Sequence, residues 1–562
     1  MKSFAEISES FLNDLLRFSP VRATGLGDHR YDHLLDEVDE KARNDKLHSA
    51  RCHFADLEAL DRDALSREEQ VDYALLHQRL RKTAWEVATL CEWEWNPLVY
   101  TGIPGDSLYL LLSREFAPLE DRLRNVGSRC REFPRFFSQA RESLVKEKVP
   151  LIHAETAVEQ NRGITSLLDH LVVPHLVDLS EEDRVALEEA LKTAREAIAE
   201  QQVWLEKELL PQAKGNPRLP ENLYRAKFDF DLFSSLTPEE LRERSEQEKT
   251  SLHEEMFRLS KKILAEQQSD FPLPENPTEQ EKRDAIRTCL EFAYEESPEV
   301  DRVVEEAYHS LKITTDFIRE NDLVTLPEDP LEIILMPEFR RGVSVAYCDA
   351  PGPLEQHGKT FYAVSPPPED WTEEQVGSFL REYNLRSLHN LTVHEAMPGH
   401  YVQLLRSNET STRLRSVLAS GTFIEGWAVY TESMMMEAGF LPGDLLMRLI
   451  VLKWNLRGVA NALLDQMIHL DGIDEATAMH LMVEEAFQEE REAAGKFRRS
   501  LLTSVQLSTY FAGYLEVVDL RKEVEEAWGD EFVLKRFHDE LMSFGSPPPA
   551  FVRALLLSEP IP

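Results

Sequence analysis

Residues 391–405 read LTVHEAMPGHYVQLL, and a proline–glycine pair interrupts an otherwise helical pattern. Proline and glycine are the residues least suited to the interior of a helix. The pair lies between His394 and His400, and Glu395 directly follows the first histidine. Zinc hydrolases often place two histidine ligands on one helix, with a glutamate after the first as general base. A His-Glu pair alone means little, since His253–Glu254 supplies another without a later histidine nearby.

The spacing of the two histidines differs from the usual four residues. On an ideal helix, residues six apart are separated by about 120° around the axis, so His394 and His400 would lie on different faces. We expect Pro398 and Gly399 to end or unwind the helix, which lets His400 turn back towards His394. The alternative is that the histidines are ordinary core residues and that the Pro-Gly pair is simply a turn.

The segment SGTFIEGWAVYTESMMMEAG at residues 420–439 adds two acids. Glu425 and Glu432 are seven residues apart, about 20° short of two full turns, so both lie on one face of an apolar helix. A carboxylate that faces inward among apolar side chains needs a partner, and a cation is an economical one. Alternatively, both side chains reach solvent or form ordinary buried pairs. We predict Glu425 as the third metal ligand and Glu432 as a residue that orients a ligand.

A third segment, QLSTYFAGYLEVVDLRKE at residues 506–523, carries two tyrosines on one helix face. Tyr510 and Tyr514 are four residues apart. A phenol that faces a developing oxyanion is a standard aid to metal-assisted amide hydrolysis. Aromatic residues at helical spacing are more often part of a core, so the segment supports a site only together with the other two.

Helix starts are well marked at several places. Thr237 and Glu240 form a predicted capping box in LTPEELRERSEQE, and Thr372 and Gln375 repeat it in WTEEQVGSFL. Ser180 precedes a run with acids in its first turn, where the helix dipole favours negative charge. Most of the chain is therefore predicted to be α-helical.

One region has a β pattern instead. Residues 331–337 (LEIILMP), 342–348 (GVSVAYC) and 360–366 (TFYAVSP) are short, β-branched or aromatic, and bounded by Pro, Gly and Asp. They predict a small antiparallel β-sheet over 331–366, beside the active-site cleft. The predicted fold class is mainly α with this one sheet.

The length of 562 residues is too great for one simple core and indicates two lobes. The segment LLPQAKGNPRLPENL, at residues 209–223, is rich in proline and marks the boundary between them. We predict an N-terminal helical lobe over 1–215. A catalytic helical lobe over 216–562 would contain the sheet and the metal site.

The charge and the cysteines restrict the partners and the location. The chain has 63 Lys and Arg against 102 Asp and Glu, a formal net charge of −39, which disfavours nucleic-acid and membrane binding. The first residues lack a basic segment followed by an apolar run, and no apolar stretch approaches the roughly 20 residues of a membrane span. The five cysteines are scattered and form no CxxC pair, which indicates reduced thiols. We expect a cytoplasmic protein.

These segments resemble a known family, the bacterial domain-of-unknown-function 885 proteins, which are regarded as zinc metallopeptidase-like proteins of the gluzincin type. The resemblance covers nearly the whole chain in order, and the His-Glu-x-x-Pro-Gly-His motif is its most specific element. The matching segments are RATGLGDHRYD (22–32), NLTVHEAMPGHYVQ (390–403), FIEGWAVYTE (423–432), LLDQMIHLDGIDEATAMHLM (463–482), RRSLLTSVQLSTYFAGYLEV (498–517) and RFHDELMSFGSPPPAFVRALL (536–556).

The arrangement is also similar, at a distance, to the thimet oligopeptidase and neurolysin family. There a His-Glu helix is followed by a glutamate ligand and then by a tyrosine-rich helix that meets the substrate. Those relatives use the four-residue histidine spacing, dipeptidyl peptidase III has one extra residue, and this chain has two. The 885 family usually shows Pro-Gly-Gln where this chain has Ser504-Val505-Gln506. The resemblance implies a two-lobed helical metallopeptidase-like fold.

Together, the residues and the resemblance predict a bacterial zinc hydrolase, a metallopeptidase with one Zn²⁺ per chain. The predicted metal ligands are His394, His400 and Glu425. Glu395 would act as general base on the zinc-activated water, and the predicted oxyanion donors are Tyr510 and Tyr514.

The expected substrate is a peptide or another small amide, and the strand at 342–348 is expected to bind an extended peptide by edge pairing. Two alternatives stay open: a non-catalytic binding or scaffold protein with the same fold, and a hydrolase of a non-peptide amide or ester.

Overall fold

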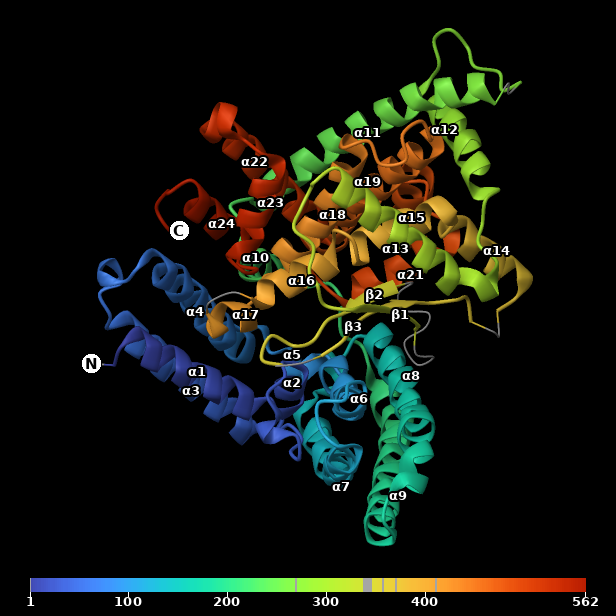
Figure 1. The fold of residues 1–562 in the computed structure, drawn as a ribbon. Coiled ribbons are helices and arrows are strands. Elements are labelled where there is room, and N and C mark those ends of the chain that lie inside the picture. The colour runs from blue at the N-terminus through green and yellow to red at the C-terminus, as the bar shows by residue number, and fades with distance from the viewer. Residues whose placement is uncertain (1, 268–269, 337–345, 356–357, 369–370, 410–411) are drawn as a thin grey trace. The chain divides into compact units, whose positions relative to one another are not determined.

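The computed structural model describes residues 2–267, 270–336, 346–355, 358–368, 371–409 and 412–562, and it is mainly helical, as predicted (Figure 1). The contacts divide the chain into two compact units. Unit 1 comprises Met1–Pro217 and two short later segments, Pro351–Lys359 and Ser411–Leu418. Unit 2 comprises Arg218–Ala350, Thr360–Thr410 and Ala419–Pro562. The sequence patterns did not predict the two later segments of unit 1.

Unit 1 is built from helices around two apolar clusters. Its α-helices are α1 (Phe4–Phe18), α2 (Pro20–Gly25), α3 (Glu40–Glu58), α4 (Arg67–Trp85), α5 (Glu92–Trp95), α6 (Leu98–Leu112), α7 (Leu119–Ser143), α8 (Leu151–Leu167), α9 (Glu181–Trp204) and α17 (Arg413–Val417). The predicted start of α9 is confirmed, because the Ser180 hydroxyl accepts a hydrogen bond from the backbone N–H of Asp183.

The segment RATGLGDHRYD has a structural role within unit 1. Gly27 has a φ of +86°, and a Cβ there would lie 2.3 Å from the backbone nitrogen of Glu355, so only glycine permits this approach. His29 pairs with Asp32 through Nδ1 at 3.0 Å and with Glu355 through Nε2 at 2.9 Å. The segment thus holds the stretch Pro351–Lys359 within unit 1.

Unit 2 is also helical and contains the sheet. Its α-helices are α10 (Glu221–Leu232), α11 (Pro238–Glu266), α12 (Glu279–Tyr294), α13 (Val303–Glu320), α14 (Glu373–Glu382), α15 (Leu385–Glu395), α16 (His400–Asn408), α18 (Gly421–Glu437), α19 (Leu445–Gln466), α20 (Glu475–Met479), α21 (Glu490–Leu502), α22 (Ser508–Trp528), α23 (Leu534–Ser543) and α24 (Pro549–Leu556). The predicted capping boxes at the starts of α11 and α14 are both present.

The sheet consists of β1 (Leu331–Leu335), β2 (Ala346–Asp349) and β3 (Thr360–Val364) in the order β1-β3-β2. β2 and β3 are antiparallel, but β1 and β3 are parallel, so the sheet is mixed and the prediction of a purely antiparallel sheet is wrong. The reason is that β3 lies between β1 and β2, so β1 does not pair with β2, the next strand along the chain. Residues 342–345 of the predicted second strand lie outside the described residues.

The sheet packs on the helices that carry the site. Tyr308 of α13 exchanges hydrogen bonds with the backbone of Ile333 in β1, both at 3.2 Å. The hydroxyls of Tyr362 in β3 and Thr392 in α15 are 3.3 Å apart and buried. The first contacts join α13 to β1, and the second fixes α15 against β3 at the centre of the sheet.

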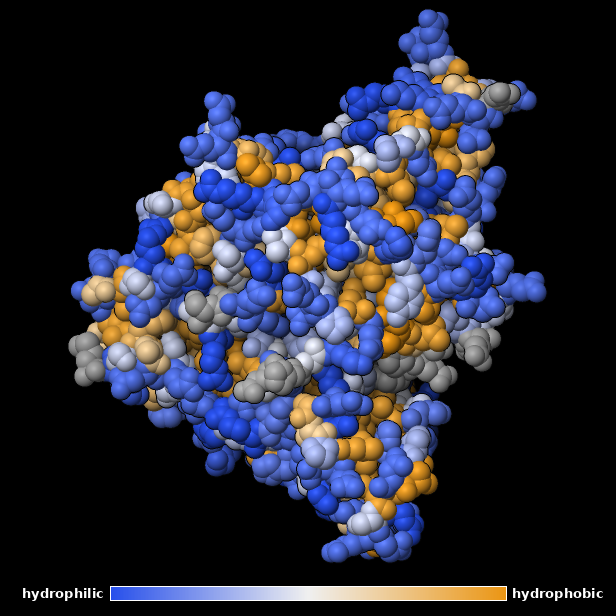
Figure 2. Space-filling model, in the orientation of Figure 1, coloured by the Kyte–Doolittle hydropathy of each residue, from blue (hydrophilic) through white to orange (hydrophobic). Residues whose placement is uncertain are grey.

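The surface agrees with the high charge of the chain. Hydrophilic residues predominate on the face shown in Figure 2, and the hydrophobic areas between them are interrupted. Among the described residues, no helix combines the length and the apolar character needed to cross a bilayer.

Candidate metal centre

The helix break predicted from the proline–glycine pair is present. α15 ends at Glu395 and α16 begins at His400. The turn between them folds back onto the end of α15, because the N–H of Gly399 donates to the Val393 carbonyl at 2.9 Å. A Cβ on Gly399 would lie 1.8 Å from the His394 carbonyl oxygen. The glycine is therefore required by close backbone approach, and the turn returns His400 to the side of His394.

The structure brings the three predicted ligands together. His394, His400 and Glu425 each offer one ligand atom, and these atoms all lie within 4.8 Å of one another. Glu425 Oε2 lies 3.8 Å from His394 Nε2 and 3.6 Å from His400 Nε2. These separations are too long for hydrogen bonds, so the glutamate does not bond either imidazole directly.

Two polar atoms of this cluster are buried without a hydrogen-bond partner among the described residues. They are Oε2 of Glu425 and Nδ1 of His400. An unsatisfied carboxylate oxygen is costly to bury. Oε2 is also the atom that faces both imidazoles. The carboxylate oxygen therefore lacks a polar partner at the point where the three ligand atoms converge.

Glu432 and Asn390 fix the orientation of the His394 side chain. Its Nδ1 lies 2.7 Å from Oε1 of Glu432. Asn390 donates from Nδ2 to the other oxygen of Glu432 at 2.6 Å. A carboxylate that accepts from Nδ1 fixes the ring and directs Nε2 towards the cluster. Glu432 thus occupies the place predicted for it, whereas Asn390 was not predicted; its only sequence signal is the i, i+4 spacing before His394.

The acids around the cluster favour a positive charge at its centre. Burial by itself lowers the pKa of His394, but the hydrogen bond and charge of Glu432, with the charges of Glu395 and Glu425, raise this pKa to about 9. Burial raises the pKa of Glu425, but His400 and then His394 outweigh it, and the net pKa lies below its usual value. Glu425 is therefore ionised at neutral pH.

Glu395 lies beside the ligands without belonging to the cluster. It is the last residue of α15 and is 9% exposed. Its Oε2 accepts a hydrogen bond from the backbone N–H of Cys348 in β2 at 3.1 Å. The carboxylate is thereby fixed between the three candidate ligands and a strand of the sheet.

Two glycines bring α22 to the cluster. A Cβ on Gly426 would lie 2.4 Å from the carbonyl carbon of Gly513, and one on Gly513 would lie 2.0 Å from the Thr422 carbonyl oxygen. α18 and α22 therefore cross in backbone contact. Glu425 and Tyr510 lie close to this crossing along their helices, so they are neighbours. Their proximity affects the pKa of Tyr510, which burial and then the charge of Glu425 raise.

The comparisons with known proteins agree with the resemblance to the 885 family, and they do not test the gluzincin-type relationship. The family model described as "Bacterial protein of unknown function (DUF885)" matches residues 20–556. The chain belongs to this family. No curated protein matches the sequence.

Two solved structures share the fold of this DUF885 protein. A protein of Shewanella oneidensis, described as a "putative lipoprotein of unknown function", is 34% identical with a TM-score of 0.84, over 99% of this chain and 100% of that one. A "putative lipoprotein" from Colwellia psychrerythraea is 15% identical with a TM-score of 0.81, over 99% of this chain and 98% of that one. At the lower identity, the likeness concerns the fold alone.

In this DUF885 protein, hydrogen bonds to Asp465 hold the start of α22 and the turn before it. The buried carboxylate of Asp465 accepts hydrogen bonds from the Tyr224 hydroxyl at 2.6 Å, the Val505 N–H at 2.9 Å and the Ser508 hydroxyl at 2.8 Å. Val505 has a φ of +69°, which is strained for a β-branched residue. The Asp465 bonds therefore hold a turn that this side chain disfavours.

Tyr514 occupies a different place from Tyr510. Burial raises its pKa to about 12, a hydrogen bond with Ser433 opposes this, and the acid with the largest effect on it is Glu248, whereas for Tyr510 it is Glu425. Tyr514 also packs at the edge of the core of unit 2. The two predicted oxyanion donors therefore do not share one environment.

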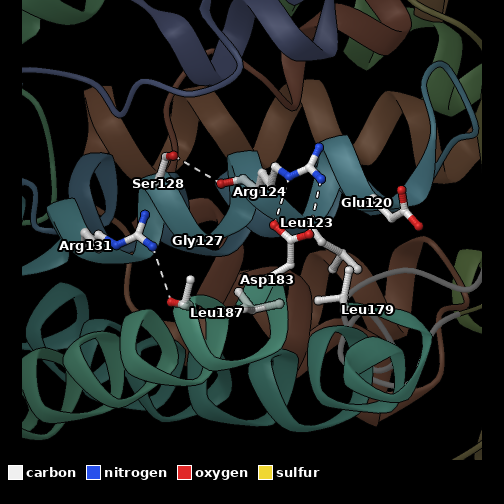
Figure 3. A pocket seen from close by; sticks show the side chains of 10 residues that line it. Glu120, Leu123, Arg124, Gly127, Ser128, Arg131, Leu179, Asp183 and Leu187 are labelled. Carbon is white, nitrogen blue, oxygen red and sulfur yellow. Dashed lines mark hydrogen bonds and ion pairs between the residues drawn. The ribbon is translucent and has the colours of Figure 1, made fainter. Parts of the chain in front are cut away.

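Two other features give no comparable site. His253 of the second His-Glu pair bonds the Glu485 backbone carbonyl at 2.6 Å, which is a structural contact. A depression between α7 and α9 in unit 1 is lined by ten residues without a histidine or cysteine (Figure 3). Two of its charged groups neutralise each other, since Arg124 pairs with Asp183 at 3.0 Å.

Proposed function

We propose that this DUF885 protein is a zinc-dependent hydrolase that cleaves peptide bonds. One observation carries the proposal: the ligand atoms of His394, His400 and Glu425 converge, and the carboxylate oxygen among them is buried without a partner. The order of the elements, a His-Glu helix, a glutamate helix and a tyrosine helix, supports the further proposal of a gluzincin-type relationship.

The donor set fits zinc. Two imidazole nitrogens and one carboxylate oxygen are a common catalytic zinc set that leaves a position for water. Ligand atoms about 2.0–2.2 Å from a tetrahedral zinc are about 3.3–3.6 Å apart. The observed 3.6 and 3.8 Å separations need only a small contraction. A bound zinc ion would supply a Lewis acid that polarises the carbonyl and acidifies water.

The remaining chemistry comes from the chain's own side chains. Glu395 accepts the proton of the attacking water, then delivers it to the leaving amine. The Cys348 N–H holds one oxygen of Glu395, which fixes the orientation of the carboxylate. Tyr510 donates its hydroxyl proton in a hydrogen bond to the oxyanion of the tetrahedral intermediate.

The sheet supports a peptide as the substrate. β2 ends the strand order β1-β3-β2, and its Cys348 N–H points to Glu395 rather than to β3. Edge pairing of an extended peptide with residues 342–348 stays a prediction; a peptide that lies beside Glu395 would have its backbone next to the general base. The cytoplasmic location stays a prediction; the "putative lipoprotein" name of the two solved relatives suggests a lipid-anchored location as its rival.

Zinc content tests the proposal most directly. The protein purified without chelator should carry close to one zinc ion per chain by elemental analysis. His394→Ala should abolish retention, and Glu425→Gln should lose metal and activity together, because a neutral amide is a poor zinc ligand. Glu437→Gln, on the same helix as Glu425, should keep both. If no transition metal is found, and added zinc neither binds nor stabilises the protein, the proposal is wrong.

Gly399→Ala should weaken zinc binding although Gly399 is no ligand. The added methyl group would lie 1.8 Å from the His394 carbonyl oxygen, so the turn must shift and displace His400. We expect a loss of about 10- to 100-fold in zinc affinity, the range for residues that orient a ligand. Competition with a chromophoric chelator measures this loss.

The matched control is Gly377→Ala in α14. Nothing lies within 4 Å of a Cβ added there. This variant should bind zinc as the wild type does. Equal affinity for both alanine variants would mean that His400 does not need this turn or does not bind zinc.

A further inference from the structure

A polar chain leads from Tyr510 to an arginine. Gln506 donates from Nε2 to the Tyr510 hydroxyl at 3.4 Å, and Arg499 donates from Nη2 to Gln506 Oε1 at 2.8 Å. Arg499 lies in the last turn of α21, and its side chain is exposed. It is also close enough for its charge to act on both Glu425 and Tyr510. A cation thus lies beside the candidate site.

Arg499 is unusual in this acidic protein. Within the part of the chain that the structure describes, it forms no ion pair with an aspartate or glutamate. Arg457 on α19, by contrast, pairs with both Glu382 and Glu492. In a chain with 102 acidic and 63 basic residues, carboxylate partners are plentiful. Gln506 holds the guanidinium in place without neutralising it.

The surroundings indicate what this cation would bind. Glu395, Glu425 and Glu432 give the site a negative field that repels anions. A substrate with an anionic group would need a fixed cation at that group. A guanidinium presents a planar fork of donors that matches a carboxylate, and Gln506 accepts from only one of its nitrogens.

We infer that Arg499 binds the free C-terminal carboxylate of a peptide, so that the protein removes residues from the C-terminal end. This inference rests on the proposed peptidase function. In this arrangement the carbonyl of the cleaved bond lies at the Tyr510 hydroxyl. One side chain, Gln506, separates Tyr510 from Arg499. Since consecutive Cα atoms are about 3.8 Å apart, the bound carboxylate lies about one or two residues beyond the cleaved bond.

The reaction is a balanced hydrolysis. Water adds across the amide C–N bond: its oxygen ends on the carbonyl carbon, and the two protons end on the leaving amine and in solution or on the new acid. The products are a shortened peptide with a new C-terminal carboxylate and a free amino acid or dipeptide. No oxidant, reductant or second substrate is needed.

The test compares short peptides of varied sequence, each prepared as the free acid and as the C-terminal amide. With wild-type protein, mass spectrometry should show free acids shortened by one or two residues, and amides shortened at least about tenfold more slowly. Arg499→Gln should lower kcat/KM for free acids by about 10- to 100-fold and leave amides unchanged. Arg499→Lys should restore part of the loss, because the charge returns without the planar fork.

Arg498→Gln is the matched control, because it removes the same charge one residue away on the same helix. It should keep the preference for free acids. Equal shortening of acids and amides by the wild type would overturn the inference, as would cleavage within the peptides. An equal loss for acids and amides in Arg499→Gln would also overturn it, because Arg499 would then act through Tyr510 alone.

A binding measurement separates this inference from the proposed function. Isothermal titration of the same acid and amide peptides into zinc-free protein requires no catalysis. The acids should bind more tightly than the amides to wild type, and Arg499→Gln should abolish the difference. If wild type cleaves nothing but shows this difference, the hydrolase proposal fails and Arg499 remains a carboxylate site. If wild type binds both forms equally, the inference about Arg499 is wrong.

Discussion

Glu395→Gln should lower kcat for any cleaved peptide by at least about 10²-fold, with zinc content near that of wild type. Glu395 is not among the three clustered ligands, so its amide should not release the metal. The glutamine oxygen can still accept the Cys348 N–H, which Glu395 Oε2 accepts at 3.1 Å, so the shape of the site should persist. What the amide cannot do is take a proton from water. Steady-state kinetics and elemental analysis on one preparation measure both quantities.

Glu254→Gln is the matched control for this variant. Glu254 also follows a histidine on a helix, but it is exposed and lies on α11. The same change of charge there should leave kcat unaltered. Full turnover by Glu395→Gln would remove the general-base role, and loss of zinc in that variant would make Glu395 a ligand instead.

The parts of the site that the sequence predicted are those that local geometry determines. Helix periodicity places Glu425 and Glu432 on one face, and the structure uses that face for a ligand atom and for the bond to His394 Nδ1. The proline–glycine pair predicted the break between α15 and α16. Capping boxes predicted the starts of α11 and α14, because N-caps depend on residues three apart.

The parts that were missed depend on contacts between distant segments. Nothing near Gly426 or Gly513 in the sequence shows that their backbones touch, although that contact sets the position of Tyr510. The parallel pairing of β1 with β3 was missed for the same reason, since strand order is decided by where β3 inserts and not by any one strand. Periodicity assigns a residue to a face, but it does not assign the partner of that face.

The surroundings of Arg499 also could not be predicted from the sequence, because they depend on the fold. The sequence places it among many basic residues and gives no sign that it lacks a carboxylate. Only the fold brings its guanidinium to Gln506, 2.8 Å away, and thus towards Tyr510. A total charge of −39 predicts which macromolecules the surface repels, but one uncompensated cation beside the site has more bearing on the substrate.

Tyr510→Phe should lower kcat by roughly 10²–10³-fold, the loss typical of one oxyanion donor, and leave zinc content unchanged. Tyr510 neighbours Glu425 through the backbone crossing of α18 and α22, and its hydroxyl is held by Gln506 at 3.4 Å. Phenylalanine keeps the packing of the ring and removes only the donor. KM should change little, because the hydrogen bond forms with the oxyanion and not with the ground-state carbonyl.

Tyr514→Phe is the internal comparison, because it removes the same hydroxyl one turn further along α22. The acid with the largest effect on Tyr514 is Glu248, whereas the acid with the largest effect on Tyr510 is the candidate ligand Glu425. We therefore expect a loss of kcat well below that of Tyr510→Phe. If the two variants lose kcat equally, both phenols face the oxyanion and the difference in their surroundings has no catalytic meaning. If Tyr510→Phe turns over as fast as wild type, α22 carries no oxyanion donor at this position, and the Gly426–Gly513 crossing serves packing alone.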